Sequence, residues 1–169
     1  MNVKMYTIIS GTNRIGSQTE KVAAEYKRIL REKNIDAGIL SLIKLDVLER
    51  TAGFIKIENE ILIPTQKFIF ILPEYNGTFP GVLKAMIDNS DIKKVWHNKK
   101  ALLTGISTGR AGNLRGIDHL TASLHYMKMH VHYNKLPISI IEKVMDKKGR
   151  LDEETLKAVD EQLNEFINY

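Results

Sequence analysis

Apolar and polar positions change along the chain between two periodicities. Short runs that are mostly apolar on both faces predict buried parallel strands at residues 4–10, 36–42, 67–73, 99–107 and 130–141. Between these runs, apolar residues recur at helical spacing and predict helices at residues 18–33, 80–90, 114–127 and 152–167. Residues 43–66 contain a glycine and a proline within a poor periodicity, so we expect only a short irregular helix there.

The alternation of strands and helices predicts an α/β protein with a parallel sheet that helices cover on both faces. The length of 169 residues suits one domain over residues 1–169, and no repeat or linker divides the chain. In doubly wound sheets, ligands bind beyond the carboxyl ends of the strands. The loops that follow the predicted strands are therefore the candidate site.

Composition narrows the chemistry. The chain has no cysteine, which excludes disulfides, zinc–thiolate centres and thiol nucleophiles. The first residues do not resemble a signal peptide, and no apolar run approaches the roughly 20 residues of a membrane span, so we expect a cytoplasmic protein with no membrane partner. The net charge of +5 suits an anionic ligand or nucleic acid. Residues 92–117 hold six lysines and arginines without an acidic residue, which marks either a solvated face or an anion-binding surface.

The loop after the first strand, SGTNRIGSQT (residues 10–19), has the glycine spacing of a P-loop. Gly11 and Gly16 are separated by four residues, but Ser17 stands where a P-loop has its lysine, and Gln18 follows it. Without that cation, a triphosphate loses its main electrostatic contact. The dinucleotide pattern G-x-G-x-x-G is absent as well.

The same loop retains the groups that bind one compact dianion. Hydroxyls of Thr12, Ser17 and Thr19, the Arg14 guanidinium and the free amides of a helix start favour a phosphate that does not react. Simple helix capping is the alternative. Arginine at a helix start opposes the helix dipole unless an anion is bound, which favours the phosphate site.

The loop after the third strand, PEYNGTFPG (residues 73–81), has the features of a heteroaromatic ring site. Pro73 ends the strand, Asn76-Gly77 predicts a tight turn, and Pro80 lies near a helix start. Gly77 allows close approach of the backbone, and Tyr75 offers an apolar wall. Taken alone, the loop is also compatible with a plain strand-to-helix turn.

Together these loops resemble those of the NAD(P)H-dependent FMN reductases, a family with azoreductase-like and quinone reductase-like members. SGTNRIGSQTEKVA is similar to the family's phosphate loop, PEYNGTFPGVLKAMID to its flavin-ring loop, and GISTGRAGNLRG (residues 105–116) to its glycine-rich third loop. The resemblance covers roughly residues 1–128. It implies a flavodoxin-like doubly wound sheet of five parallel strands in the order 2-1-3-4-5, with FMN between the first and third strands.

The resemblance also implies which residues bind the cofactors. The phosphate positions carry Thr12, Arg14, Ser17 and Thr19, and Gln18 belongs to the same site; Thr19 replaces the usual Asn. The ring positions carry Pro73, Glu74, Tyr75, Asn76 and Gly77. The third loop contributes Ser107 and Gly109, with Arg110 as a candidate for the ribose phosphate of NADPH. The chain departs from the family pattern at Ala85-Met86, at Asn89 and in a short 43–66 segment, which affects the substrate pocket and the dimer contact.

The function implied is a flavoenzyme that passes electrons from NADPH or NADH through FMN to a small acceptor such as free flavin or a quinone. The hydride chemistry belongs to the flavin, so no catalytic side chain is expected. The family implies a homodimer or homotetramer. A flavodoxin-like electron carrier is the alternative, and its expected acidic surface disagrees with +5.

Two other site types are disfavoured by the sequence. His119 and His125 fall on different faces of a helix. His130 and His132 share a predicted strand face, but no carboxylate is close to them in sequence, so no metal site is expected. Trp96, flanked by lysines, has the composition of a nucleic acid contact, but a helix-to-strand connection with solvated lysines is the better interpretation. We therefore expect no nucleic acid partner.

Overall fold

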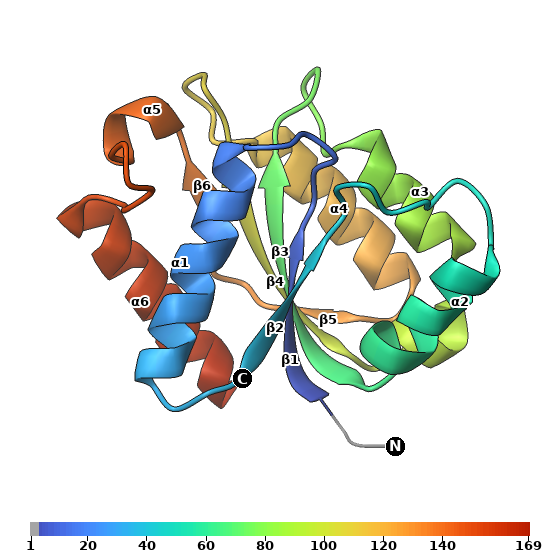
Figure 1. The fold of residues 1–169 in the computed structure, drawn as a ribbon. Helices are drawn as coiled ribbons and strands as arrows, with labels where there is room; N and C mark the ends of the chain where they lie inside the picture. The colour runs from blue at the N-terminus through green and yellow to red at the C-terminus, as the bar shows by residue number, and fades with distance from the viewer. Residues whose placement is uncertain (1–3) are drawn as a thin grey trace.

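The computed structural model describes residues 4–169, which form one parallel sheet with helices on both faces (Figure 1). The strands are β1 (Lys4–Ser10), β2 (Ala37–Ser41), β3 (Thr65–Pro73), β4 (Lys100–Ile106), β5 (His130–Val131) and β6 (Leu136–Ile138). The helices are α1 (Gln18–Glu32), α2 (Ala52–Ile57), α3 (Gly81–Asn89), α4 (Leu114–Tyr126), α5 (Ile141–Val144) and α6 (Glu153–Asn168), with π-helical turns η1 (Glu58–Leu62) and η2 (Ile92–Trp96). The strand order is β2-β1-β3-β4-β5, as expected for a flavodoxin-like sheet.

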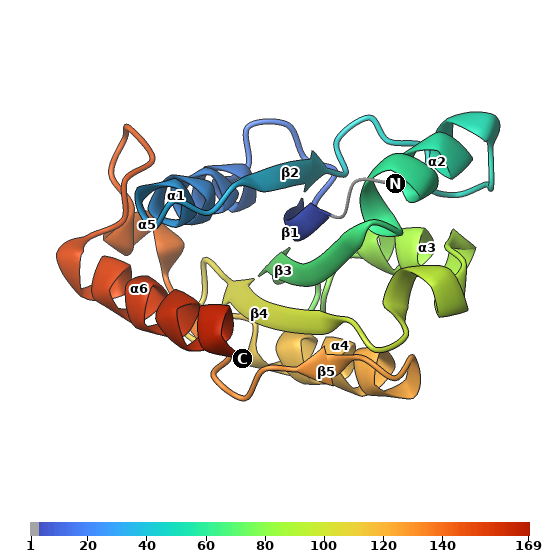
Figure 2. The same ribbon diagram turned by 90° about the horizontal axis from the view of Figure 1, so that it is seen from below.

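The central strands are apolar on both faces because the sheet separates two cores. In β3, Phe68 and Phe70 face the core under α2, α3 and α4, whereas Ile69 and Ile71 face the core under α1 and α6. Figure 2 shows these helices in two layers on opposite sides of the sheet. The side chains of Phe68, Ile69, Phe70 and Ile71 are all fully buried. The continuous apolar runs of the sequence therefore correspond to strands that pack on both sides.

The prediction of one strand over residues 130–141 is wrong. Residues 132–135 leave the sheet, so β5 pairs with β4 at Lys100 and Ala101, and β6 pairs with β4 only from Thr104 onward. A side chain fills the gap: Gln162 of α6 donates from Nε2 to the main-chain oxygens of Leu103 (3.1 Å) and Asn134 (2.9 Å). The buried amide thus replaces strand pairing at this edge.

The segment 43–66 contains a short helical stretch, Ala52–Leu62, as expected, and an ion pair with a buried carboxylate links this segment to the residues after α3. The Thr51 hydroxyl caps α2 by accepting from the Phe54 N–H at 3.1 Å. Glu58 is buried and accepts hydrogen bonds from Arg50 at 2.6 and 2.9 Å and from the Asp91 N–H at 2.6 Å. Burial opposes the charge of Glu58, but these hydrogen bonds outweigh it and hold its pKa below the usual value.

Two lysines of the basic segment 92–117 are structural. Lys99 is buried and donates from Nζ to the carbonyls of Ile63 (2.8 Å) and Thr65, and this burial lowers its pKa. Lys100 donates to the carbonyl of Tyr169. Trp96 is fully buried and donates from Nε1 to Ser90 Oγ at 2.7 Å, so its ring is not available to stack on a base. Among residues 4–169, no helix is long and apolar enough to cross a membrane.

Candidate functional site

The loops after β1, β3 and β4 meet at the carboxyl ends of these strands and enclose a cavity of about 310 Å³. In Figure 1 these loops lie together at the upper edge of the sheet. Predicted site residues that line the cavity are Arg14, Ser17, Gln18, Thr19, Pro73, Glu74, Tyr75 and Ser107. The lining does not include the predicted residues Thr12, Asn76, Gly77, Gly109 and Arg110.

The first loop places a helix N-terminus at the cavity. Ser17 is the N-cap of α1, and its Oγ accepts from the Glu20 N–H at 3.3 Å. Capping and anion binding are therefore compatible, because the N-cap and first residues of this 15-residue helix, Ser17 to Thr19, line the cavity and the capping bond uses the N–H of Glu20. Gln18 Oε1 is buried and has no hydrogen-bond partner within residues 4–169.

Thr12 belongs to the same loop but does not line the cavity. Its hydroxyl oxygen accepts from the Arg14 N–H at 3.1 Å and lies 2.6 Å from the Tyr75 hydroxyl, and Thr12 is fully buried. The structure thus shows Thr12 as a support of the loop, without an exposed hydroxyl for a ligand.

The second loop is a tight two-residue turn. Asn76 and Gly77 have φ of 52° and 80°, the left-handed values that such a turn requires, and Tyr75 and Thr78 exchange backbone hydrogen bonds of 2.9 and 3.2 Å. In the described part of the chain, no backbone hydrogen bond uses the N–H of Asn76 or Gly77. Two donors therefore remain free at the tip of this loop.

Side chains of α4 support the outer side of the turn. Arg115 lies against Gly77, where an added Cβ would be 3.1 Å from its guanidinium. His119 Nδ1 is 2.8 Å from the Thr78 hydroxyl. His119, one of the histidines considered as a metal ligand, thus has a structural partner in Thr78. His130 is exposed whereas His132 is buried, so this pair does not share a face, and no metal-binding group of three or more His, Cys, Asp or Glu residues occurs between residues 4 and 169.

In the third loop, the Ser107 hydroxyl is used by the loop itself. It donates to the Gly109 carbonyl at 2.8 Å and accepts from the Gly112 N–H at 2.9 Å. Gly109 faces open space. Arg110 is exposed, and the described residues offer it no ion pair.

Asn113 is a supporting residue that the sequence interpretation missed. It is buried, adopts a left-handed φ of 62°, and donates from Nδ2 to the carbonyls of Leu72 (3.2 Å) and Pro73 (3.0 Å). It therefore fixes the end of β3 directly before the ring loop. Gly116 leaves room for this side chain, because a Cβ there would overlap the Asn113 amide, but this contact is visible only in the structure.

Ile141 was missed as well, because it was placed at the end of a strand. It lines the cavity, and its N–H donates to the Ser107 carbonyl at 3.0 Å. The adjacent Ile140 has a φ of 48° and donates to the Gly109 carbonyl at 2.9 Å. The segment after β6 thus closes one wall of the cavity.

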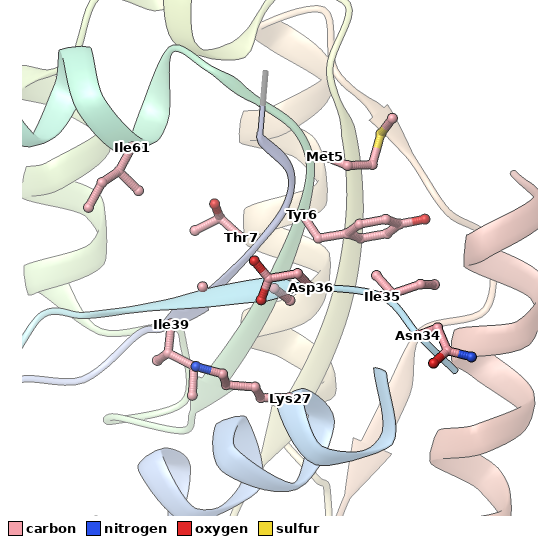
Figure 3. Close-up of a pocket in the computed structure, with 11 residues that line it drawn as sticks. Met5, Tyr6, Thr7, Lys27, Asn34, Ile35, Asp36, Ile39 and Ile61 are labelled. Atoms are coloured by element: carbon pink, nitrogen blue, oxygen red, sulfur yellow. The ribbon is translucent and has the colours of Figure 1, made fainter. Parts of the chain in front are cut away.

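A larger cavity of about 780 Å³ lies at the opposite, amino ends of β1 and β2 (Figure 3). Its lining includes the polar side chains Lys27, Asn34 and Asp36 beside the apolar Met5 and Ile39. It has no helix N-terminus or glycine-rich loop directed into it. We place the functional site at the carboxyl ends, where the loops converge, despite the smaller volume.

The sheet order and the position of the site define a flavodoxin-like α/β protein. The structure resembles the flavoenzyme NAD(P)H:acceptor oxidoreductase FerB of Paracoccus denitrificans, with a TM-score of 0.80 and 21% identity over 99% of this chain and 97% of that one. It also resembles an NADH:FMN oxidoreductase in its apo form, with a TM-score of 0.79 and 17% identity over 97% and 88% of the chains, and flavodoxin 2 of Bacillus cereus, with a TM-score of 0.67 and 13% identity over 98% and 99%. At these identities the likeness establishes the fold.

The sequence comparisons establish the family. Residues 5–140 match the NADPH-dependent FMN reductase family, and the chain belongs to it. An NAD(P)H-dependent FMN reductase of Pseudomonas aeruginosa is 32% identical over 99 residues, which are 56% of this chain and 54% of that protein. A second one, from Saccharomyces cerevisiae, is 34% identical over 82 residues, 48% of this chain and 39% of its relative. The chain thus spans about half, or less, of the length of these relatives.

Proposed function

We propose that the protein is an NAD(P)H-dependent FMN oxidoreductase that passes electrons from a nicotinamide through FMN to a small acceptor, such as free flavin or a quinone. One observation carries this proposal: a helix N-terminus, an arginine and the first residues of the loop that carries a turn with free amides line one cavity in a member of the FMN reductase family.

The donor set fits FMN in chemistry. Arg14, Ser17 and the first amides of α1 would hold the phosphate, since they combine a cation, a hydroxyl and the positive end of a helix dipole. Gln18 Oε1 is a buried acceptor without a partner in residues 4–169, which suits a ribityl hydroxyl as donor. The free N–H groups of Asn76 and Gly77 would bond to acceptors of the ring edge.

In this reaction, the residues of the protein would bind and orient the cofactor and stabilise charge on it. When FMN is bound, it supplies the hydride-accepting centre. The backbone N–H groups of Asn76 and Gly77 would stabilise negative charge on an acceptor atom bound to them, and they would need no reorganisation because the turn is already formed. Asn113 and Arg115 hold that turn from behind.

The third loop suggests the nicotinamide preference. Arg110 is exposed and lies two residues after Thr108, which lines the cavity. It belongs to a segment without acidic residues, and arginine suits bidentate contact with the ribose phosphate of NADPH. We therefore propose a preference for NADPH over NADH.

Cellular location and assembly are further parts of the proposal. We propose a cytoplasmic location, where nicotinamide cofactors are available to the enzyme. A homodimer or homotetramer would cover exposed apolar side chains such as Tyr126 and Ile92 on the α3–α4 side. Light scattering coupled to gel filtration measures the assembly directly.

The decisive experiment is anaerobic reduction. FMN is added to the purified protein, unbound flavin is removed, and NADPH is mixed in while the flavin absorbance is followed. Rapid bleaching is the expected result. Bound flavin that stays oxidised would instead support an electron carrier, and failure to retain any flavin would exclude both functions.

A further inference from the structure

Tyr75 connects the two loops that the proposed function assigns to the phosphate and to the ring. It belongs to the loop after β3, but its hydroxyl oxygen lies 2.6 Å from Thr12 Oγ1 in the loop after β1. The Arg14 guanidinium carbon lies over its aromatic ring, 4.1 Å from the centroid. One side chain of the ring loop thus contacts both the support and the cation of the phosphate loop.

The hydrogen bonds of Thr12 hold the Tyr75 ring in place. Thr12 Oγ1 accepts from the Arg14 N–H at 3.1 Å, and Thr12 is fully buried. The same oxygen forms a hydrogen bond with the Tyr75 hydroxyl, in which either hydroxyl can be the donor. This bond anchors the far end of the ring beneath Arg14.

The position of Arg14 follows from this anchored ring. A guanidinium that lies over an aromatic face can keep its N–H groups free for hydrogen bonds at its edges, which bidentate phosphate contact requires. No ion pair within residues 4–169 uses Arg14. Arg14 also lines the cavity beside Ser17 and Gln18. The ring of Tyr75 thus acts as a platform, and the face toward Arg14 is not open to a flavin.

We propose that Tyr75 is a positioning residue for Arg14, so that the ring loop helps to build the phosphate site. This inference rests on the proposed function, because it assumes that the cavity binds FMN. It differs from the interpretation of Tyr75 as a wall for the flavin ring, and it predicts that phosphate recognition depends on a residue 61 positions away from Arg14 in the sequence.

Comparison of FMN with riboflavin, which lacks the phosphate, separates the two roles. The quantity to measure is the ratio of the riboflavin Kd to the FMN Kd, obtained by fluorescence titration of the apoprotein. Arg14→Ala should lower this ratio about tenfold to a hundredfold, as expected for the loss of a hydrogen bond to a charged group. Tyr75→Leu should lower it roughly twofold to fivefold through loss of the stacked platform.

The double variant tests whether the two residues act together. In the Arg14→Ala background, Tyr75→Leu should leave the ratio unchanged, because there is no guanidinium left to position. Tyr75→Phe is the matched control: it keeps the platform, and its ratio should stay closer to wild type than that of Tyr75→Leu. Thermal unfolding of each apoprotein shows that it is folded.

The outcomes distinguish this inference from the proposed function. Equal losses of FMN and riboflavin affinity in Tyr75→Leu would show a ring wall and overturn the inference, while flavin binding itself would stand. A wild-type protein that binds neither flavin would overturn the proposed function. If Tyr75→Leu does not fold, Arg14→Lys replaces it: a lysine keeps the charge but cannot stack flat, so an undiminished ratio in that variant would contradict the platform.

Discussion

Asn113 gives the sharpest test of how the scaffold supports the ring loop. Its Nδ2 donates to the carbonyls of Leu72 and Pro73 at 3.2 and 3.0 Å, and its backbone is left-handed with φ of 62°. Replacement by glycine removes both donors, and glycine adopts this left-handed φ without steric strain. Replacement by alanine also removes the donors, and it keeps a Cβ in the left-handed region, which alanine tolerates less well than asparagine does.

The magnitudes follow from these two contributions. Two net hydrogen bonds stabilise the fold by about 1–3 kcal/mol, so Asn113→Gly should lose roughly 2 kcal/mol. Asn113→Ala should lose about 1–2 kcal/mol more, because its Cβ is disfavoured at this φ. For a chain of this size, a loss of 2 kcal/mol lowers Tm by about 4–8 °C.

Thermal unfolding of the apoproteins measures both differences. Asn98→Gly is the matched control, because Asn98 has a φ of 60° but is exposed and makes no side-chain hydrogen bond within residues 4–169; its Tm should change little. An unchanged Tm for Asn113→Gly would refute the role assigned to the two hydrogen bonds. Equal Tm values for the glycine and alanine variants would refute the argument from the left-handed backbone.

Four other substitutions test separate parts of the site and the core. Gly77→Val should weaken binding of FMN and riboflavin alike, by about tenfold, since its φ of 80° disfavours a side chain and its Cβ would crowd Arg115; normal riboflavin binding would place the ring elsewhere. Arg110→Ala should lower kcat/KM for NADPH about tenfold more than for NADH without changing FMN affinity, and equal losses in steady-state kinetics would contradict a contact with the ribose phosphate. Gly109→Ala should leave Tm unchanged, because its Cβ would point into open space, and a lower FMN affinity in titrations would then locate the ligand beside it. Tyr26→Phe should lower the free energy of unfolding by about 1–3 kcal/mol in urea titrations, because its fully buried hydroxyl bonds at 2.7 Å to two polar partners; an unchanged urea midpoint would show that the network contributes nothing.

The strands of the sheet could be predicted because their signal is local, whereas the order of the strands was implied by the family resemblance. Strands buried on both faces appear as continuous apolar runs, as at Phe68–Leu72, and β1 begins and ends at the predicted residues. The Asn76-Gly77 turn could also be predicted, since few residues other than asparagine and glycine adopt its left-handed backbone conformation. These features depend on residues that are close in sequence.

The errors arose where distant residues decide the structure. The break after β5 depends on Gln162, which bonds to the Leu103 carbonyl 59 positions away. The burial of Thr12 depends on Tyr75, which lies 63 positions away. Neither contact has a local pattern, so the sequence indicated a longer strand and an accessible hydroxyl.

The segment after β6 shows how such distant contacts complete the site. A β-branched residue with φ of 48° is strained, yet Ile140 is held there because its N–H and that of Ile141 bond to two carbonyls of the third loop. The Ser107 hydroxyl donates to the carbonyl of Gly109, which also accepts from Ile140, so the loop and the segment share one hydrogen-bond network. The third loop therefore cannot move toward a ligand without breaking bonds to a part of the chain that lies at the end of the matched family region. Its shape at the cavity is set before a cofactor binds, which reduces the entropy lost on binding.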